Sequence, residues 1–202
     1  MMSKKQLAIK LSKLKSNPKP KLKLEQYEIP SELAADILHE AYMQGDIENK
    51  TIADFGCGTG RLGIGAALLG AKKVICIDID KNLLEIAKQN AKSLEIKNIE
   101  FIQKDVSDFN RKVDTVIQNP PFGIQSEKLD RLFLKKAIEC AKKIYSLHKG
   151  PEARKFLENF IENNNGKIQK ILKFKFQIPY TFKFHRKPKI DIDVDLYVIK
   201  RC

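Results

Sequence analysis

The 202-residue chain contains no tryptophan, only three histidines and only four cysteines. The cysteines, at positions 57, 76, 140 and 202, are far apart and the histidines are equally scattered, so the spacing indicates neither a disulfide framework nor a zinc knuckle. No stretch approaches 18 consecutive apolar residues, and lysines interrupt the apolar positions of residues 1–15, which disfavours a membrane span and an export signal. We therefore expect a cytoplasmic protein with reduced thiols, no bound metal and no membrane contact.

The positive charge, a net +13 at pH 7, is concentrated at the two ends of the chain. Residues 1–23 contain eight lysines and no acidic residue, and residues 166–202 contain ten basic and three acidic residues, whereas residues 24–165 hold 20 basic and 22 acidic groups. Lysine and arginine gain binding free energy when they displace counterions from phosphates. This distribution predicts a nearly neutral catalytic body whose ends bind a polyanion; the alternative is that the charged ends only maintain solubility.

Short apolar segments alternate with amphipathic helical patterns through the middle of the chain. The pattern predicts strands at residues 51–55, 74–77, 99–103, 113–118 and 144–147. It predicts helices at residues 31–45, 62–69, 81–94 and 151–163, and a further helix within residues 128–142. Strands separated by helices of this length form a mostly parallel sheet with helices on both faces. The predicted fold class is therefore α/β, and ligands in such sheets bind beyond the carboxyl ends of the strands.

Both ends of the chain differ from this α/β body. Three leucines recur at helical spacing among lysines before an Asn-Pro-Lys-Pro segment, which predicts a basic helix and an extended arm over residues 1–23. Residues 167–178 and 190–199 alternate apolar and polar side chains, so we expect an antiparallel hairpin at the sheet edge. Residues 24–202 are predicted to form a single domain.

The first candidate site is the Asp-Phe-Gly-Cys-Gly-Thr-Gly loop at residues 54–60, which leaves a predicted strand and enters a predicted helix. Gly56, Gly58 and Gly60 have no side chains that would keep a ligand from the backbone, and the helix start supplies free amide donors. The next strand ends in Asp78, which is placed to accept hydrogen bonds from the hydroxyls of a ribose. The loop therefore predicts a cofactor that contains a nucleoside.

Two cofactors fit this loop. Three glycines within residues 58–63 also match the G-x-G-x-x-G fingerprint of dinucleotide enzymes. Asp54, however, is badly placed beside a pyrophosphate and well placed to organise the pocket of a cationic amino acid, which S-adenosylmethionine offers. The strand must also run to Phe55, so the dinucleotide frame would begin two residues too late. We therefore expect S-adenosylmethionine rather than a nicotinamide, with Asp105 reaching the exocyclic amine of its adenine.

The second candidate site is the Asn119-Pro120-Pro121-Phe122-Gly123 loop, directly after an apolar segment. An exocyclic amine is a poor nucleophile until its hydrogens are drawn away, because its lone pair is delocalised. The side-chain carbonyl of Asn119 and the backbone carbonyl of Pro120 can accept those N–H groups, and Phe122 offers a face on which a planar substrate stacks. Asn-Pro-Pro alone is also an ordinary turn, but one strand beyond a cofactor loop it predicts methyl transfer to an amino nitrogen.

The two loops in this order resemble the class I methyltransferases that modify amino nitrogens. A longer match, from residue 24 through the Tyr-Ser-Leu-His-Lys segment at 145–149 to residue 196, resembles the archaeal and eukaryotic enzymes that methylate N6 of an adenosine in small-subunit ribosomal RNA. The resemblance implies a Rossmann-like sheet and an adenine held by Asn119, Pro120, Pro121 and Phe122. The cofactor contacts that it implies are Gln26, Gly56, Gly58, Gly60, Asp78, Asp105 and Val106.

The chain departs from this family at one point. Where the family has a Pro-Thr pair after the tyrosine, this chain has Glu28-Ile29 and then Pro30, so a contact through a threonine hydroxyl is absent or replaced. In eukaryotes the family works with a small zinc-binding activator protein that lends a strand to the sheet edge. Such a protein is therefore a candidate partner, and ribosomal RNA is the expected substrate.

The predicted RNA contacts lie between the last two strands, where aromatic and cationic residues interleave at Lys183, Phe184, His185, Arg186 and Lys187. The alternative is that the phenylalanines of this segment, Phe182 and Phe184, only pack on the sheet. Direct methyl transfer needs neither a covalent intermediate nor a metal, so we expect a structural role for His148. Other functions remain open: methylation of a glutamine side chain on a translation factor, methylation of adenine N6 in tRNA or DNA, or RNA binding by a scaffold with a decayed catalytic core.

Overall fold

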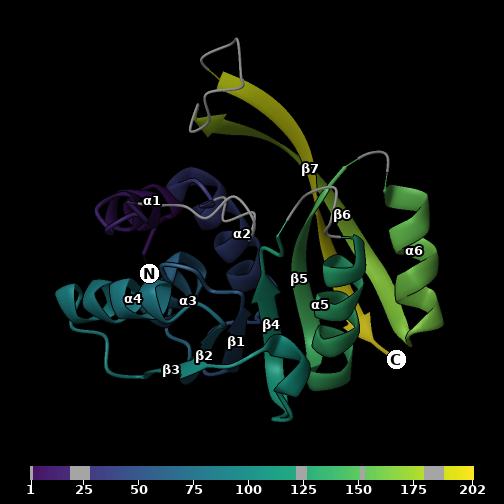
Figure 1. The fold of residues 1–202 in the computed structure, drawn as a ribbon, viewed down its shortest axis with the longest axis horizontal. Coiled ribbons are helices and arrows are strands. Elements are labelled where there is room, and N and C mark those ends of the chain that lie inside the picture. Colours follow the sequence, from purple (N-terminus) through teal and green to yellow (C-terminus); the bar gives the residue numbers. More distant parts are fainter. Residues whose placement is uncertain (1, 19–27, 122–126, 151–152, 180–188) are drawn as a thin grey trace.

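Figure 1 shows the fold in a computed structural model, which describes residues 2–18, 28–121, 127–150, 153–179 and 189–202. The described strands form one sheet in the order β3-β2-β1-β4-β5-β7-β6. Neighbouring strands are parallel from β3 to β5, and β7 is antiparallel to both β5 and β6. The predicted α/β class and C-terminal hairpin are confirmed. The strands are β1 Thr51–Phe55, β2 Lys73–Asp78, β3 Ile99–Gln103, β4 Val113–Gln118, β5 Ala141–Lys149, β6 Gly166–Pro179 and β7 Lys189–Arg201.

Helices cover both faces of this sheet (Figure 1). One face packs against α1 Lys4–Ser12, α2 Ser31–Met43, α3 Arg61–Leu68 and α4 Lys81–Ser93. The other face packs against α5 Glu127–Cys140 and α6 Arg154–Asn163, and a short 3-10 helix, Val106–Asp108, follows β3. Within the described ranges, no helix has the length and apolar character that crossing a bilayer requires.

The boundaries around β5 differ from the sequence prediction. α5 ends at Cys140 and β5 begins at the next residue, whereas the pattern predicts a helix within residues 128–142 and a strand only over residues 144–147. β5 pairs with β4 on one side and β7 on the other, so hydrogen bonds hold it in strand geometry along its whole length. Such pairing depends on residues far away in the sequence, which local propensity does not include.

α1 packs into the core. Leu7 and Leu11 are fully buried in the cluster that α2 and α3 share. The helices approach closely at Gly65 of α3, where an added Cβ would lie 2.3 Å from Leu38 Cδ1 and 3.5 Å from both δ-methyl groups of Leu11. The predicted amino-terminal helix is therefore present, while the boundary between arm and domain at residue 23 falls outside the described residues and stays a prediction.

Leu11→Ala should lower the free energy of unfolding by about 2–5 kcal/mol, because truncating a buried leucine loses transfer free energy and leaves a cavity. Ile9→Ala is the matched control on the same helix, because the Ile9 side chain is 49% exposed, and it should change stability by at most about 0.5 kcal/mol. Denaturant unfolding measures both values. Similar small changes in the two variants would mean that α1 does not contribute to the folded core.

Candidate active site

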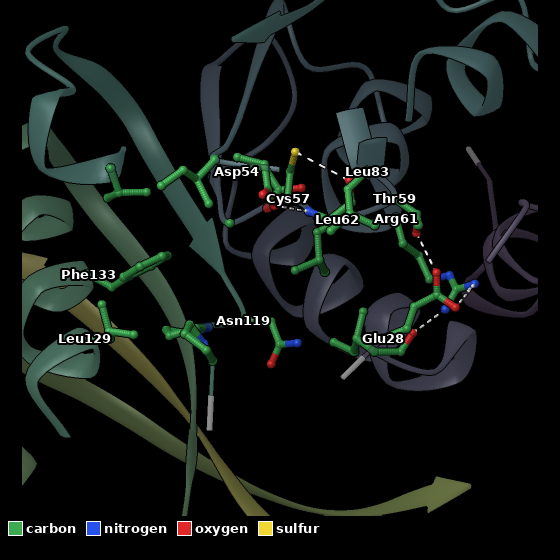
Figure 2. Close-up of a pocket in the computed structure, with 18 of the residues that line it drawn as sticks. Glu28, Asp54, Cys57, Thr59, Arg61, Leu62, Leu83, Asn119, Leu129 and Phe133 are labelled. Carbon is green, nitrogen blue, oxygen red and sulfur yellow. Dashed lines mark hydrogen bonds and ion pairs between the residues drawn. The ribbon is translucent and has the colours of Figure 1, made fainter. Parts of the chain in front are cut away.

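A cavity of about 330 Å³ opens at the carboxyl ends of β1, β2 and β4 (Figure 2). Open α/β sheets bind ligands at this edge because parallel strands bring their following loops together there. The register pairs Phe55 of β1 with Ile77 of β2 and with Gln118 of β4. The loops of the two candidate sites therefore leave neighbouring strands at the same level and line one cavity.

The loop after β1 adopts a conformation that favours glycine at three positions. Gly56, Gly58 and Gly60 have φ angles of 65°, 55° and 85°, which residues with a Cβ rarely adopt. An added Cβ at Gly58 would meet no heavy atom of the described residues within 4 Å, and Gly58 lines the cavity. The backbone at Gly58 is thus open to a ligand, as a close cofactor contact requires.

Asp54 lies at the end of β1 and is almost completely buried while lining the cavity. Its Oδ2 accepts a hydrogen bond from the Gly63 amide at 2.7 Å, which ties the strand to the first turns of α3. Burial raises the pKa of Asp54 to about 7, and the negative charge of Asp78 adds to this rise, whereas the Gly63 hydrogen bond opposes it. Asp54 can therefore change its charge near neutral pH.

Asp78, Asp105 and Val106 line the same cavity. Asp78 Oδ2 accepts from the Gly58 amide and its Oδ1 from the Asp80 amide, each at 2.8 Å. Each carboxylate oxygen has a second lone pair, so Asp78 can also accept ribose hydroxyls. Asp105 is exposed and accepts from the Ser107 amide at 2.8 Å, so it caps the 3-10 helix in addition to its predicted role at the cofactor.

Asn119, Pro120 and Pro121 follow the last residue of β4 and line the same cavity as the glycine loop. Figure 2 shows Asn119 among the residues around this cavity. The structure therefore brings the described parts of both predicted sites together. Gln26, Phe122 and residues 183–187 lie outside the described residues, so their contacts stay predictions. The roles of the residues inside the cavity, as ligands of cofactor or substrate, are proposals as well.

An apolar wall formed by α5 was not predicted from the sequence. Leu129, Leu132 and Phe133 line the cavity, and Phe133 Cε1 lies 3.0 Å from where a Cβ on Gly56 would stand. Figure 2 shows Leu129 and Phe133 on one side of the cavity, with Glu28 and Arg61 on the other. The available signal was their i, i+3, i+4 spacing soon after the Asn-Pro-Pro loop, which places them on one helix face near the sheet edge.

Glu28 occupies the place where the chain departs from the resembled family. Its Oε1 accepts a hydrogen bond from Thr59 Oγ1 at 2.6 Å, and its Oε2 lies 3.5 Å from Arg61 Nη2. Arg61 also donates from Nη1 to the backbone oxygen of Ile29. These contacts join the segment before α2 to the glycine loop. The segment contributes the Glu28 carboxylate, and the threonine in the contact, Thr59, belongs to the loop.

Carboxylates outnumber cationic side chains in the cavity wall. The wall contains four acids and two bases, namely Glu28, Asp54, Asp78, Asp105, Lys104 and Arg61. This balance favours a positively charged ligand such as S-adenosylmethionine over the pyrophosphate of a dinucleotide. In the part of the chain that the structure describes, no group of three His, Cys, Asp or Glu residues is arranged to hold a metal ion.

The strand order, the glycine loop after β1 and the acid at the end of β2, together with a match to a methyltransferase family model, make the chain a class I methyltransferase that uses S-adenosylmethionine. A family model described as a methyltransferase domain matches residues 46–178, and the chain belongs to that family. The expected fold and cofactor are thereby confirmed.

Three known proteins illustrate the similarity. An rRNA N(6)-adenosine-methyltransferase from Danio rerio is 37% identical, over 96% of this chain and 97% of its own. The crystal structure of a candidate RNA methyltransferase from Pyrococcus horikoshii is 45% identical, with a TM-score of 0.92 over 100% of this chain and 98% of its own. A magnesium protoporphyrin IX methyltransferase from Synechocystis, solved with bound S-adenosylmethionine, is 19% identical, with a TM-score of 0.65 over 83% and 78% of the two chains, and shares the fold.

S-adenosylmethionine should bind more tightly as the pH rises from about 5.5 to 7.5, by up to about tenfold per pH unit below the pKa of Asp54, because a cationic ligand favours the ionised carboxylate. Calorimetry in buffers of different ionisation enthalpy should detect a proton released on binding. Asp54→Asn is the control and should flatten this dependence, whereas a wild-type affinity independent of pH would contradict the assignment.

The same group affects the unliganded protein in the opposite sense. The pKa of Asp54 in the folded protein, about 7, lies above its ordinary value of 3.8, so ionising it costs stability. The neutral form of Asp54 therefore contributes stability at low pH, and the free energy of unfolding should decrease by that contribution as the pH rises from about 4 to 7. Ligand binding and folding stability thus respond to Asp54 ionisation with opposite signs, which separates the two effects experimentally.

Proposed function

We propose that the protein transfers a methyl group from S-adenosylmethionine to N6 of an adenosine in structured RNA, and that this RNA is small-subunit ribosomal RNA. The observation that carries the proposal is the shared cavity of the Asn119-Pro120-Pro121 segment and the glycine loop. An amide carbonyl beside a backbone carbonyl suits an acceptor with two N–H donors, which is what adenine N6 presents. The rRNA adenosine methyltransferase from Danio rerio, similar over nearly its whole length, supports the same substrate.

The residues of this chain contribute orientation and electrostatics to the reaction. Asn119 and the Pro120 carbonyl accept the N6 hydrogens, so the nitrogen lone pair is directed towards the cofactor side of the cavity. When bound, S-adenosylmethionine supplies an electrophilic methyl group: the N–C bond forms as the S–C bond breaks, its electron pair stays on sulfur, and a proton leaves N6 for water. Leu129, Leu132 and Phe133 exclude water from one side of the acceptor.

The charge distribution favours RNA over protein as the substrate. Exposed lysines lie along the outer strand β6, at Lys167, Lys170, Lys173 and Lys175. Among these, Lys170 pairs with Glu40 at 2.8 Å. Positive charge on this strand continues the basic character of residues 183–187, so we propose that the β6–β7 hairpin contacts the RNA backbone. A glutamine on a translation factor would have no need of such a surface.

Two further predictions belong to the same proposal. A small zinc-binding activator protein is proposed as a partner that pairs with one of the outer strands, β3 or β6. A cytoplasmic location is proposed as well, because ribosomal RNA is accessible there. An already unpaired adenosine is the expected target, since extruding a base from a duplex costs a few kcal/mol.

Asn119→Ala should abolish most methyl transfer while leaving the affinity for S-adenosylmethionine nearly unchanged, because the Asn119 carbonyl faces the acceptor. The measurement is transfer of labelled methyl to purified ribosomal RNA, with ribosomal and release-factor proteins and with tRNA and DNA as parallel acceptors. Asn98→Ala is the control, because Asn98 bonds the Ala71 carbonyl away from the cavity. Label found only on protein would refute the RNA assignment, and equal loss of cofactor binding would make the loop a structural support.

Reversing the charges of Lys183, Arg186 and Lys187 to glutamate should weaken RNA binding. The salt slope of log K should fall by up to about 0.7–0.9 for each phosphate that the variant no longer neutralises. The control reverses three exposed lysines, Lys72, Lys97 and Lys142, which lie beside the amino ends of β2, β3 and β5. Cofactor affinity and melting temperature should barely change in either variant. An unaltered RNA affinity and salt slope would exclude the hairpin as the RNA-binding surface.

A further inference from the structure

A chain of buried polar side chains lies directly behind the acceptor loop. Gln118, the last residue of β4, donates from Nε2 to Ser146 Oγ at 2.8 Å, and Ser146 Oγ lies 2.6 Å from His148 Nε2. The three residues are essentially fully buried. They do not line the cavity, so they do not touch the ligands directly, and a role in the reaction must act through the residues that do.

The chain of polar groups continues towards α5. His148 Nδ1 lies 3.9 Å from Asp130 Oδ1, and within the described residues neither of these two buried atoms makes a hydrogen bond. The Tyr197 ring packs edge-on against His148, with 5.7 Å between ring centroids. Polar groups in such surroundings lose their hydration and are costly unless they are paired. Burying these polar side chains in an otherwise apolar layer therefore costs free energy, and apolar residues at the same positions would not incur that cost.

The direction of every hydrogen in this chain follows from its two ends. A carboxylate only accepts, so the arrangement that suits Asp130 places the imidazole hydrogen of His148 on Nδ1, facing that side chain. His148 Nε2 must then accept from the Ser146 hydroxyl, and Ser146 Oγ in turn accepts from the Gln118 amide. The opposite direction would set a lone pair of Nδ1 against the lone pairs of Asp130. Both ends thus favour the same arrangement, in which Gln118 is the first donor.

The two ends of this chain adjoin two walls of the cavity. Gln118 is bonded covalently to Asn119, whose carbonyl is proposed to hold the acceptor amine. Asp130 follows Leu129 and precedes Phe133 by three residues, so it lies on the turn of α5 that forms the apolar wall. A shift in the Gln118 side chain or in the first turns of α5 would therefore move groups that position the acceptor.

We propose that Gln118, Ser146, His148 and Asp130 form a relay that positions the acceptor loop relative to α5. His148 carries its proton on Nδ1, 3.9 Å from Asp130 Oδ1, and this contact joins β5 to α5. His148 is a positioning residue that transfers no proton to or from the substrate. The positioning role rests on the proposed function of Asn119, whereas the tautomer and the coupling between loop and helix do not.

The test removes one buried oxygen from the middle of the relay. Ser146→Ala should lower kcat for RNA methylation by about ten- to a hundredfold, because small misplacements of reacting groups have effects of that size, with the dissociation constant of S-adenosylmethionine unchanged. Thr115→Val is the matched control. Thr115 is a buried hydroxyl on β4 that donates to the Asp46 carbonyl at 2.7 Å, outside the relay and the cavity, so its loss should leave kcat unchanged. Gln118→Leu interrupts the relay at the end beside Asn119 and should reproduce the effect of Ser146→Ala.

Nuclear magnetic resonance supplies a readout that does not depend on the methyl acceptor. The 15N spectrum of the wild type should show His148 protonated on Nδ1, and Ser146→Ala should shift the amide resonances of Asn119 and Leu129, which Thr115→Val should leave in place. A wild-type His148 protonated on Nε2, or unshifted Asn119 and Leu129 resonances in Ser146→Ala, would refute the relay. If these spectra are as expected but no RNA is methylated by the wild type, the proposed function fails and the relay stands. An unchanged kcat in an active, folded Ser146→Ala would refute the positioning role.

Discussion

Two buried carboxylates hold the cofactor loop, and the rest of the site depends on them. Asp54 accepts from the Gly63 amide at the start of α3, and Asp78 accepts from the Gly58 amide within the loop. Burial makes a carboxylate costly, and hydrogen bonds from backbone amides offset part of that cost. These donors are backbone amides, so the hydrogen bonds that fix the loop conformation do not depend on the side chains of the loop. The conformation still requires glycine at the positions with left-handed backbone angles.

The parallel register of the sheet extends this local order to the acceptor side. Phe55 is paired with both Ile77 and Gln118, so the loops after β1, β2 and β4 begin at one level of the sheet. Apolar clusters on both faces fix that level, because a shift in register would move side chains out of their layers. The separation of the two loops that line the cavity is thus set by the packing of the whole domain rather than by the loops alone.

The sequence predicts the parts of the site whose conformation is local. The glycine loop with Asp54, and the Asn119-Pro120-Pro121 turn, are recognisable because each requires particular residues within a few positions. The Glu28–Arg61 contact is not predictable in this way, since it joins segments that meet only in the folded chain. For the apolar wall of α5, the helical spacing predicts a shared helix face but not that this face meets the cavity. The same reason explains β5, whose length is set by partners on both sides, and the relay through Ser146 and His148, which becomes visible only when α5 lies over the sheet.

The Glu28–Arg61 pair resolves an electrostatic conflict in the cavity. Arg61 is almost fully buried and lines the cavity, where an unpaired guanidinium would disfavour a cationic ligand such as S-adenosylmethionine. Glu28 lies 3.5 Å from Arg61 and neutralises that charge, while its other oxygen accepts from Thr59 in the cofactor loop. At residue 28, where the sequence departs from the resembled family, the carboxylate balances Arg61 and joins the segment before α2 to the glycine loop.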